Sequence, residues 1–237
     1  MNRNRIQKLI SDAGICSRRK AEILILEKRV KVNGLESNIG DKADIKIDNI
    51  EVDGYSIPKN IIHKVLLANK PKGVISTCHD DRGRRTVLDL IPYQLKNGMH
   101  TIGRLDLESR GAILITNNGA LTQRLTHPSF NHPKTYMVWV KGIISNRCIN
   151  KWQKGVEIDG KLTREAKIDL IKFDSQRSLL RIKMWEGRNR QIRKVAEKLS
   201  YPVLDLQRIC IAGIKLNNLK EGDWRELAKE EWDRLIS

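Results

Sequence analysis

The sequence predicts an α+β fold in two parts, a small N-terminal module in residues 1–60 and a larger domain in residues 61–237. In the larger part, strand-like runs outnumber helical runs and do not alternate regularly with them, which favours a mostly antiparallel or mixed sheet. Pro58 to Asn60 is typical of a short linker. A chain of 237 residues is long enough for each part to bury a core of its own.

Two helices and a strand are expected within the N-terminal module. Apolar residues at helical spacing begin at Ile6, and Gly14 is expected to end this first helix. Ser17 is a good N-cap for a second helix. The run V-K-V-N-G that ends at Gly34 alternates apolar and polar residues and closes on Asn-Gly, so it predicts a strand that leads into a tight turn.

The larger domain is expected to consist of strands joined by short helical segments. Apolar, β-branched and aromatic residues mark the strands, and amphipathic periodicity marks the helices. The expected strands begin near residue 65 and cover 112–116, 135–142, 166–173 and 178–185, and the expected helices cover 120–125, 145–154, 189–199 and 230–235.

The charge of the chain is strongly unbalanced. Lys and Arg number 45 against 28 Asp and Glu, a net charge of +17, which favours an anionic partner such as nucleic acid. A membrane surface is the rival partner, but no run approaches the roughly 18 apolar residues of a spanning helix, and the basic residues are spread along the chain. The polar segment 1–8 lacks an apolar signal core, so we expect a cytoplasmic protein and no membrane partner.

No metal site or disulfide framework is expected. The four cysteines lie far apart without a C-x-x-C pair, as is typical of reduced thiols. His127 and His132 are close in sequence, but each precedes a proline in an expected loop, so a ligand role is disfavoured.

The stretch G-R-L-D-L-E-S-R-G-A-I-L-I-T-N-N-G, residues 103–119, holds the first candidate for chemistry. Asp106 lies between two leucines, directly after Arg104, and an apolar run closed by a turn signal follows. On composition alone, this acid is either a catalytic group or a turn acid that caps a helix or pairs with Arg104.

The stretch E-G-R-N-R-Q-I-R-K, residues 186–194, is the second candidate. Ile192 begins the apolar face of the expected helix. Arg188, Arg190 and Arg193 crowd the first turns of that helix, where the helix dipole disfavours positive charge by a few tenths to about 1 kcal/mol each. This arrangement predicts a site for an anion, and phosphate is the natural candidate.

The third candidate is K-T-Y at the start of an expected strand. Tyr136 is either an ordinary core residue or a platform on which a base stacks. Because one strand tyrosine alone does not separate these interpretations, both remain open at this point.

The string A-G-I-C-S-R-R-K-A-E, followed by R-V-K-V-N-G, resembles the small S4-type RNA-binding domain. Lys28 departs from that family, which usually has glycine there, so we expect strain or a different helix end at Lys28. A solvated basic face without RNA contacts is the alternative. The resemblance implies RNA phosphate contacts from five cations: Arg18, Arg19, Lys20, Arg29 and Lys31.

Taken together, the three candidate stretches resemble the bacterial ribosomal RNA pseudouridine synthases of the RsuA family, in the family's order. K-P-K-G near residue 71 and G-V-x-x-D-G-K-x-T at residues 155–163 agree with the same pattern. Small departures stand at Ser109, Ala112 and Asn118, where Thr, Leu and Asp are usual. None of them changes the acid, the tyrosine or the arginines.

The resemblance implies an isomerase that breaks the N-glycosidic bond of a uridine, turns the base and rejoins it through carbon. It implies that Asp106 is the nucleophile or general base, that Tyr136 stacks on the base, and that Arg193 pairs with the aspartate and orients it. Arg104 would fill the space left by the flipped nucleotide or hold its phosphate, and Ile192 would pack on the base. Arg188 and Arg190 would also contact RNA.

Such a rearrangement requires no cofactor, metal or second substrate. The expected partner is ribosomal RNA or a pre-ribosomal particle, and the large subunit is favoured. The protein is expected to be a monomer. Small-subunit RNA, transfer RNA, and a purely RNA-binding assembly protein are the alternatives that the sequence leaves open.

Overall fold

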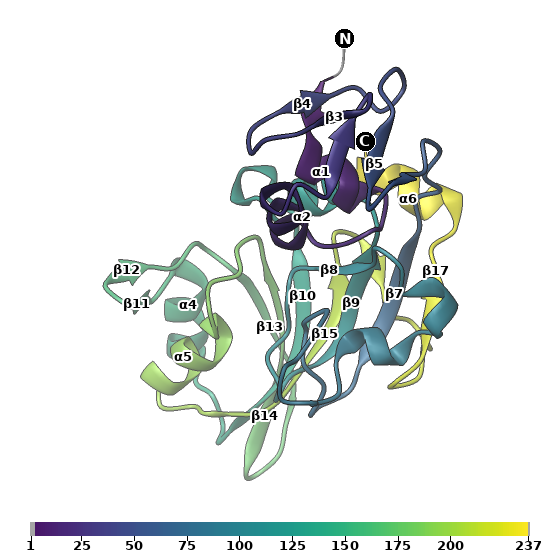
Figure 1. Ribbon diagram of the computed structural model, residues 1–237. Helices are drawn as coiled ribbons and strands as arrows, with labels where there is room; N and C mark the ends of the chain where they lie inside the picture. The colour runs from purple at the N-terminus through teal and green to yellow at the C-terminus, as the bar shows by residue number, and fades with distance from the viewer. Residues whose placement is uncertain (1–2, 237) are drawn as a thin grey trace.

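The computed structural model describes residues 3–236 and has two parts joined near residue 60. The N-terminal module lies above one end of a large sheet (Figure 1). In the larger part, helices and a short hairpin lie beside the strands at one edge of this sheet (Figure 1). The sheet is mixed, and its helices do not alternate regularly with its strands, so the predicted α+β class is confirmed.

The N-terminal module packs two short helices on small antiparallel sheets. Its core is formed by residues such as Ile6, Ile10, Ile25 and Val30, which are at most 1% exposed. Ser17 caps the second helix as predicted, because its side chain accepts a hydrogen bond from the amide of Lys20. The elements are β1 (Asn4–Arg5), α1 (Ile6–Asp12), α2 (Arg18–Leu26), β2 (Val30–Val32), β3 (Leu35–Glu36), β4 (Lys42–Ala43), β5 (Ile50–Val52) and β6 (Tyr55–Ser56).

Helix α2 ends with the strained residue that the sequence predicts. Lys28 has a φ of 60°, in the left-handed region that favours glycine. The amide of Lys28 donates to the carbonyl of Ile25 at 3.1 Å, and the amide of Arg29 donates to that of Leu24 at 3.0 Å. These two bonds form a Schellman motif, so the helix ends in the usual way although a lysine occupies the glycine position.

The larger domain is built on one nine-stranded mixed sheet. Its main path runs β13-β14-β10-β15-β9-β7-β17, while β8 pairs with β9 and β16 pairs with β15. The pairing of β15 with β9 is parallel, and the other named pairs are antiparallel. The strands are β7 (Val65–Lys70), β8 (His100–Ile102), β9 (Arg110–Thr116), β10 (Lys134–Lys141), β13 (Lys167–Phe173), β14 (Arg177–Met184), β15 (Val203–Ile211), β16 (Ile214–Lys215) and β17 (Trp224–Glu226).

The helices of the larger domain cover the sheet and lie close to the predicted positions. Asn118 caps α3, since its side chain accepts from the amides of Ala120 and Leu121 at 3.0 Å. The amide oxygen therefore supplies the cap that the family's usual aspartate would supply. The helices are α3 (Gly119–Thr126), α4 (Asn146–Lys154), α5 (Gln191–Lys198) and α6 (Lys229–Ile236), and a hairpin of β11 (Glu157–Ile158) and β12 (Lys161–Leu162) follows α4.

One central strand, β15, is missing from the sequence prediction. It lies between β10 and β9, so it joins the two halves of the sheet. Its sequence V-L-D-L-Q-R-I-C-I places Asp205, Gln207 and Arg208 in the middle of an apolar run, which hides both the alternation and the continuous apolar pattern of a buried strand.

The two parts of the chain are in close contact. A Cβ atom at Gly98 would come within 2.9 Å of the Cα atom of Gly14. The side chain of Asn117 donates to the carbonyl of Ile62 and accepts from the amide of Lys64, so it holds the linker against the sheet. The end of α1 therefore packs against the turn before β8, and the linker is held beside the end of β9.

We expect Lys28→Gly to stabilise the protein by roughly 0.5–1 kcal/mol, because glycine removes the cost of the left-handed conformation. Lys20→Gly is the matched control inside α2, where glycine should destabilise by about 1 kcal/mol. Urea unfolding of both variants measures this difference. A destabilised Lys28→Gly variant would contradict the backbone conformation described above.

Candidate active site

A pocket of about 570 Å³ opens in the larger domain between the loop after β8, the start of β10 and the segment before α5. The three candidate stretches of the sequence, far apart along the chain, meet in this pocket. Seven of the predicted site residues line it: Arg104, Asp106, Tyr136, Arg188, Arg190, Ile192 and Arg193.

Asp106 lies on the loop between β8 and β9, and residues after β7 hold this loop. Ser76 Oγ donates to the carbonyl of Leu105 at 2.8 Å and accepts from the amide of Leu105 at 3.0 Å. The amide of Gly73 donates to the carbonyl of Leu107 at 3.0 Å. The backbone is therefore fixed on both sides of Asp106, while its side chain remains 33% exposed to the pocket.

Lys70 supports the same loop from below. Its side chain is fully buried, and its ammonium donates to the carbonyls of Pro71 and Ser109, each at 2.8 Å. Burial lowers the pKa of Lys70 from 10.5 to about 8. The K-P-K-G segment thus places a cation directly under the aspartate loop, at a cost in desolvation.

The arginine that lies nearest to Asp106 is not the predicted one. An Nη1 atom of Arg190 lies 3.9 Å from the Asp106 carboxylate. Arg193 instead donates from Nη2 to the carbonyl of Glu108 at 3.0 Å and to Ser109 Oγ at 3.3 Å. Among the described residues, no ion pair of 4.0 Å or less joins Arg193 to Asp106. Arg193 therefore holds the backbone after the aspartate, and the predicted direct pairing is not formed in this structure.

Arg193 is still an incompletely paired cation in the pocket. Its Nε atom is buried and has no hydrogen-bond partner among the described residues. Burial, and then repulsion from Arg190, lower the pKa of Arg193 from its usual value. An anion that entered the pocket would therefore gain from both arginines.

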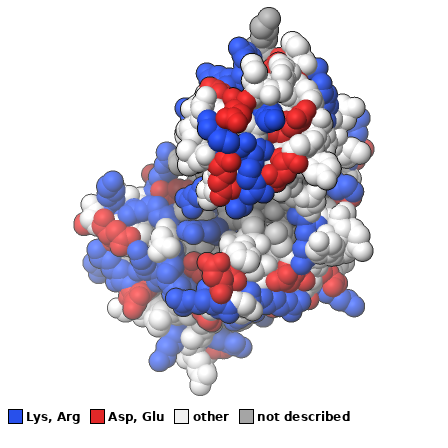
Figure 2. Space-filling model, in the orientation of Figure 1, with Lys and Arg blue, Asp and Glu red and all other residues white. Residues whose placement is uncertain are grey.

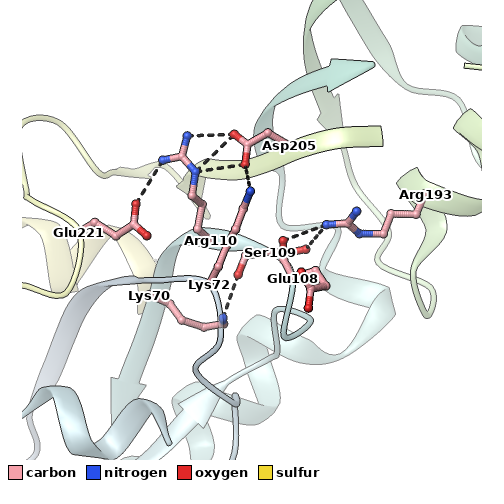
Figure 3. Close-up of polar contacts among 8 residues, drawn as sticks. All are labelled: Lys70, Lys72, Glu108, Ser109, Arg110, Arg193, Asp205 and Glu221. Carbon is pink, nitrogen blue, oxygen red and sulfur yellow. Dashed lines mark hydrogen bonds and ion pairs between the residues drawn. The ribbon is translucent and has the colours of Figure 1, made fainter. Parts of the chain in front are cut away.

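Ion pairs anchor the far end of the same loop to β15 (Figure 3). Arg110 donates to the carboxylate of Asp205 at 2.9 Å, and Lys72 lies 2.6 Å from it. Arg110 also lies 3.5 Å from Glu221. Burial works against ionisation of Asp205, but the bonds from Arg110 and Lys72 outweigh it and lower the pKa of Asp205.

The apolar walls of the pocket come from neighbouring elements. Tyr136 on β10 and Ile192 on α5 are 8% and 6% exposed, and both line the pocket. Both residues also belong to one core cluster, so Tyr136 is a core residue that also lines the pocket, and base stacking on it stays a prediction.

Arg208 on β15 is a pocket residue that the sequence analysis missed. It lies opposite Tyr136 in the sheet register and is 3% exposed. The stretch Val203–Ile211 carried no recognised motif, and the signal that was available is an arginine, beside Asp205 and Gln207, inside a run that begins and ends with apolar residues.

Arg188 has a structural contact that was not predicted. Its guanidinium donates to the carbonyls of Ile158 at 2.5 Å and Lys161 at 3.0 Å, so it closes the β11–β12 hairpin onto the segment before α5. The helix itself begins at Gln191, two residues later than predicted. Arg190 forms its N-cap in the left-handed conformation, with a φ of 50°. Of the three arginines, only Arg193 lies within the helix.

The predicted RNA-binding cations of the N-terminal module differ in whether acidic side chains pair with them. Within the described part of the chain, Arg18, Arg19 and Lys20 form no ion pair at 4.0 Å or less. Arg29 is bound at 2.6 Å by Asp53 and at 2.9 Å by Glu27, so its charge is compensated locally. Lys31 is exposed on β2.

The distribution of surface charge differs between the N-terminal module and the larger domain. Basic and acidic side chains are interleaved over the N-terminal module (Figure 2). Lys and Arg dominate the side of the larger domain that carries α4, α5 and the β11–β12 hairpin (Figure 2). The basic surface is therefore more continuous beside the pocket than on the N-terminal module.

Residues 3–236 contain no group of three or more His, Cys, Asp and Glu side chains placed to hold a metal ion. They also contain no helix with the length and hydropathy needed to span a membrane.

Comparison with known proteins identifies the family. Residues 64–198 match the RNA pseudouridylate synthase family, and residues 4–39 match the S4 domain. The chain belongs to the RNA pseudouridine synthase family. The synthase is therefore an isomerase with an N-terminal S4 domain, as the resemblance predicted. The match over residues 64–198 goes against the alternative of an RNA-binding protein without catalysis.

Similar proteins cover nearly the whole chain. Ribosomal large subunit pseudouridine synthase B of Bacillus subtilis is 39% identical over 98% of this chain and 95% of that protein. The dual-specificity RNA pseudouridine synthase RluF of Escherichia coli is 35% identical over 96% of this chain and 76% of that protein. A crystal structure of a pseudouridylate synthase superposes with a TM-score of 0.71 at 25% identity and covers 98% of this chain and 99% of that one.

The synthase requires glycine at position 111, where β9 pairs with Arg208 of β15. Gly111 has a φ of 112°, and a Cβ atom there would come within 2.6 Å of the backbone nitrogen of Arg208 and still closer to its carbonyl oxygen. Gly103, in the same motif, has a φ of 73° but open space around it.

Gly111→Ala should therefore cost at least about 3 kcal/mol, since neither backbone can move away easily. Gly103→Ala, the matched control, should cost only the roughly 1–2 kcal/mol of the left-handed conformation. The free energy of unfolding of each variant, measured in urea, checks this. Equal losses would show that residue 111 does not pack tightly on Arg208.

The buried Lys70 predicts a pH dependence of stability. Between about pH 8 and 10.5, the unfolded chain holds a proton at Lys70 that the folded chain has released. The free energy of unfolding should therefore rise with pH in this window, by up to about 3 kcal/mol from this group. Lys70→Met lacks the titrating group, so the wild-type protein should gain stability relative to this variant between pH 7.5 and 10. Parallel stability curves for the two proteins would contradict the burial of a titratable ammonium.

Proposed function

We propose that the synthase converts a uridine of large-subunit ribosomal RNA to pseudouridine in the pocket around Asp106. The observation that carries this proposal is the convergence of seven residues from three separate stretches on one pocket, with the Asp106 carboxylate one-third exposed in it. Pockets of this size accept a small ligand such as one nucleoside, and perturbed charges inside them are typical of active sites.

The uridine has to leave its stacked position before it can react. Base flipping into a pocket costs a few kcal/mol and presents both the sugar and the base to the enzyme. Tyr136 and Ile192 offer apolar faces for the base, and the exposed Arg104 and Arg190 at the pocket rim are placed for the RNA backbone.

In the reaction, the bond between C1′ and N1 breaks, and a bond between C1′ and C5 forms after the base has turned. The proton on C5 is lost, and N1 gains one, so the atoms and the oxidation state of the nucleoside do not change. Asp106 acts either on the sugar as a nucleophile or on a proton as a general base. Arg190, whose Nη1 atom lies 3.9 Å from the carboxylate, and Arg193 place positive charge beside Asp106.

Large-subunit RNA is the proposed substrate because the relative at 39% identity is named as a large-subunit synthase. Activity on more than one class of RNA is the second candidate, since RluF at 35% identity is named as a dual-specificity RNA pseudouridine synthase. Pseudouridine mapping in both ribosomal RNAs and in transfer RNA, from cells with and without the synthase, separates these alternatives. Loss of pseudouridine from the large-subunit RNA supports the proposal, and loss only elsewhere rejects it.

Asp106→Asn should abolish pseudouridine formation and leave RNA affinity within about threefold, because the amide keeps the shape but cannot ionise. Glu108→Gln is the matched control, since it removes a neighbouring exposed negative charge without changing the pocket carboxylate. Both variants are assayed for pseudouridine in RNA and for RNA binding. A fully active Asp106→Asn variant would overturn the assignment of the site.

A further inference from the structure

The wall of the pocket contains a buried cation that the proposed roles do not use. Arg208 is 3% exposed, and its Nε atom donates to the carbonyl of Ala112 at 2.6 Å. Its Nη2 atom is buried from solvent and has no hydrogen-bond partner among the described residues. A buried guanidinium with an unused donor is costly, so its retention requires an explanation.

The sheet places Arg208 beside the proposed position of the base. Arg208 is the register partner of Tyr136 on β10 and of Gly111 on β9. Directly paired residues on neighbouring strands project from the same side of a sheet, so Arg208 and Tyr136 are neighbours in the pocket wall. Because a Cβ atom at position 111 would collide with the backbone of Arg208, the glycine of the aspartate motif is what allows the β15 backbone to approach β9 at this position.

The charges around Arg208 favour an anion. Lys134 also lines the pocket, and its pKa is lowered first by burial and then by repulsion from Arg208. Arg208 also contributes, after burial, to the lowered pKa of Lys70. Two cations, Arg208 and Lys134, thus line the pocket, and Lys70 is close enough to be repelled by Arg208. The acids Asp106, Glu221 and Glu108 act on Lys70 in the opposite direction.

We propose that Arg208 is the fixed cation that stabilises the negative charge that develops on the uracil ring when the bond between C1′ and N1 breaks. The electron pair of that bond stays with the base, which therefore becomes anionic before C5 bonds to C1′. A preorganised charge in a water-poor site stabilises such a state effectively, because it needs no reorganisation during the reaction. This inference rests on the proposed assignment of the pocket to the flipped uridine.

The burial of Arg208 distinguishes this role from phosphate binding. The RNA backbone stays at the pocket rim, where Arg104 and Arg190 are exposed. Arg208 instead lies in the inner wall, next to a tyrosine that is 8% exposed. A contribution to the rate of the chemical step is therefore expected, with little contribution to RNA affinity.

The test uses the full-length protein with Arg208→Gln, Arg208→Lys and, as a matched control on the same sheet, Arg225→Gln. Arg225 lies on β17 and pairs with Glu231, away from the pocket. The single-turnover rate of pseudouridine formation at saturating RNA, the Kd for the same RNA and the melting temperature are measured for each variant. Arg208→Gln should lower the rate at least about 100-fold with Kd within threefold, and Arg208→Lys should retain at least tenfold more rate than Arg208→Gln. Arg225→Gln should keep the wild-type rate.

A folded Arg208→Gln variant whose rate stays within threefold of wild type would overturn the inference. A loss that appears in Kd rather than in the saturated rate would also overturn it. If Arg208→Gln does not fold, the neutral Arg208→Met takes its place, and a folded methionine variant whose saturated rate stays within threefold of wild type, or that loses only RNA affinity, rejects the role. Asp106→Asn, assayed in parallel, separates the two proposals: its inactivity beside an active Arg208→Gln leaves the proposed function intact and rejects only the role of Arg208.

Discussion

The pairing of the Lys70 ammonium with two backbone carbonyls is the contact on which the pocket depends. It fixes the carbonyl of Ser109 from below, while Gly73 and Ser76 fix the backbone beside Leu105 and Leu107. Asp106 is thereby presented by a loop whose backbone is hydrogen-bonded on both sides of the acid. Burial of the Lys70 ammonium costs desolvation free energy, and the loop geometry is obtained at that cost. Active sites often contain groups that are locally unfavourable in this way.

The sequence predicted which residues lie around Asp106 better than it predicted which side-chain contacts they form. Asp106, Tyr136 and Arg193 line one pocket as expected, because each is embedded in a motif whose local structure is specific. The direct pairing of Arg193 with Asp106 is not formed, since an arginine side chain is long enough to reach several acceptors, and the carbonyl of Glu108 is one of them. Which acceptor it uses depends on how the backbones pack, which no motif records.

The strand that brings the site together was predicted least well. The helices α3, α4 and α5 follow clear periodicity, so their existence could be predicted even where an end was displaced, as at Gln191. In β15, by contrast, polar residues occupy positions that a buried strand usually fills with apolar ones. Asp205 and Arg208 are tolerated there because Arg110 and the carbonyl of Ala112 pair with them. Partners from distant parts of the chain make such a pattern stable, so the pattern could not be recognised locally.

The parallel pairing of β9 with β15 has a consequence for the width of the pocket. Among the described residues, two register pairs, Gln207 with Arg110 and Arg208 with Gly111, join the half of the sheet that carries Tyr136 to the half that leads into Asp106. The ladder is short, but the two backbones are in close contact at Gly111. The bonds from Arg110 to Asp205 and from Arg208 to Ala112 cross the same junction. Side-chain bonds therefore act together with this one close backbone contact to set the distance between Asp106 and the aromatic wall of the pocket.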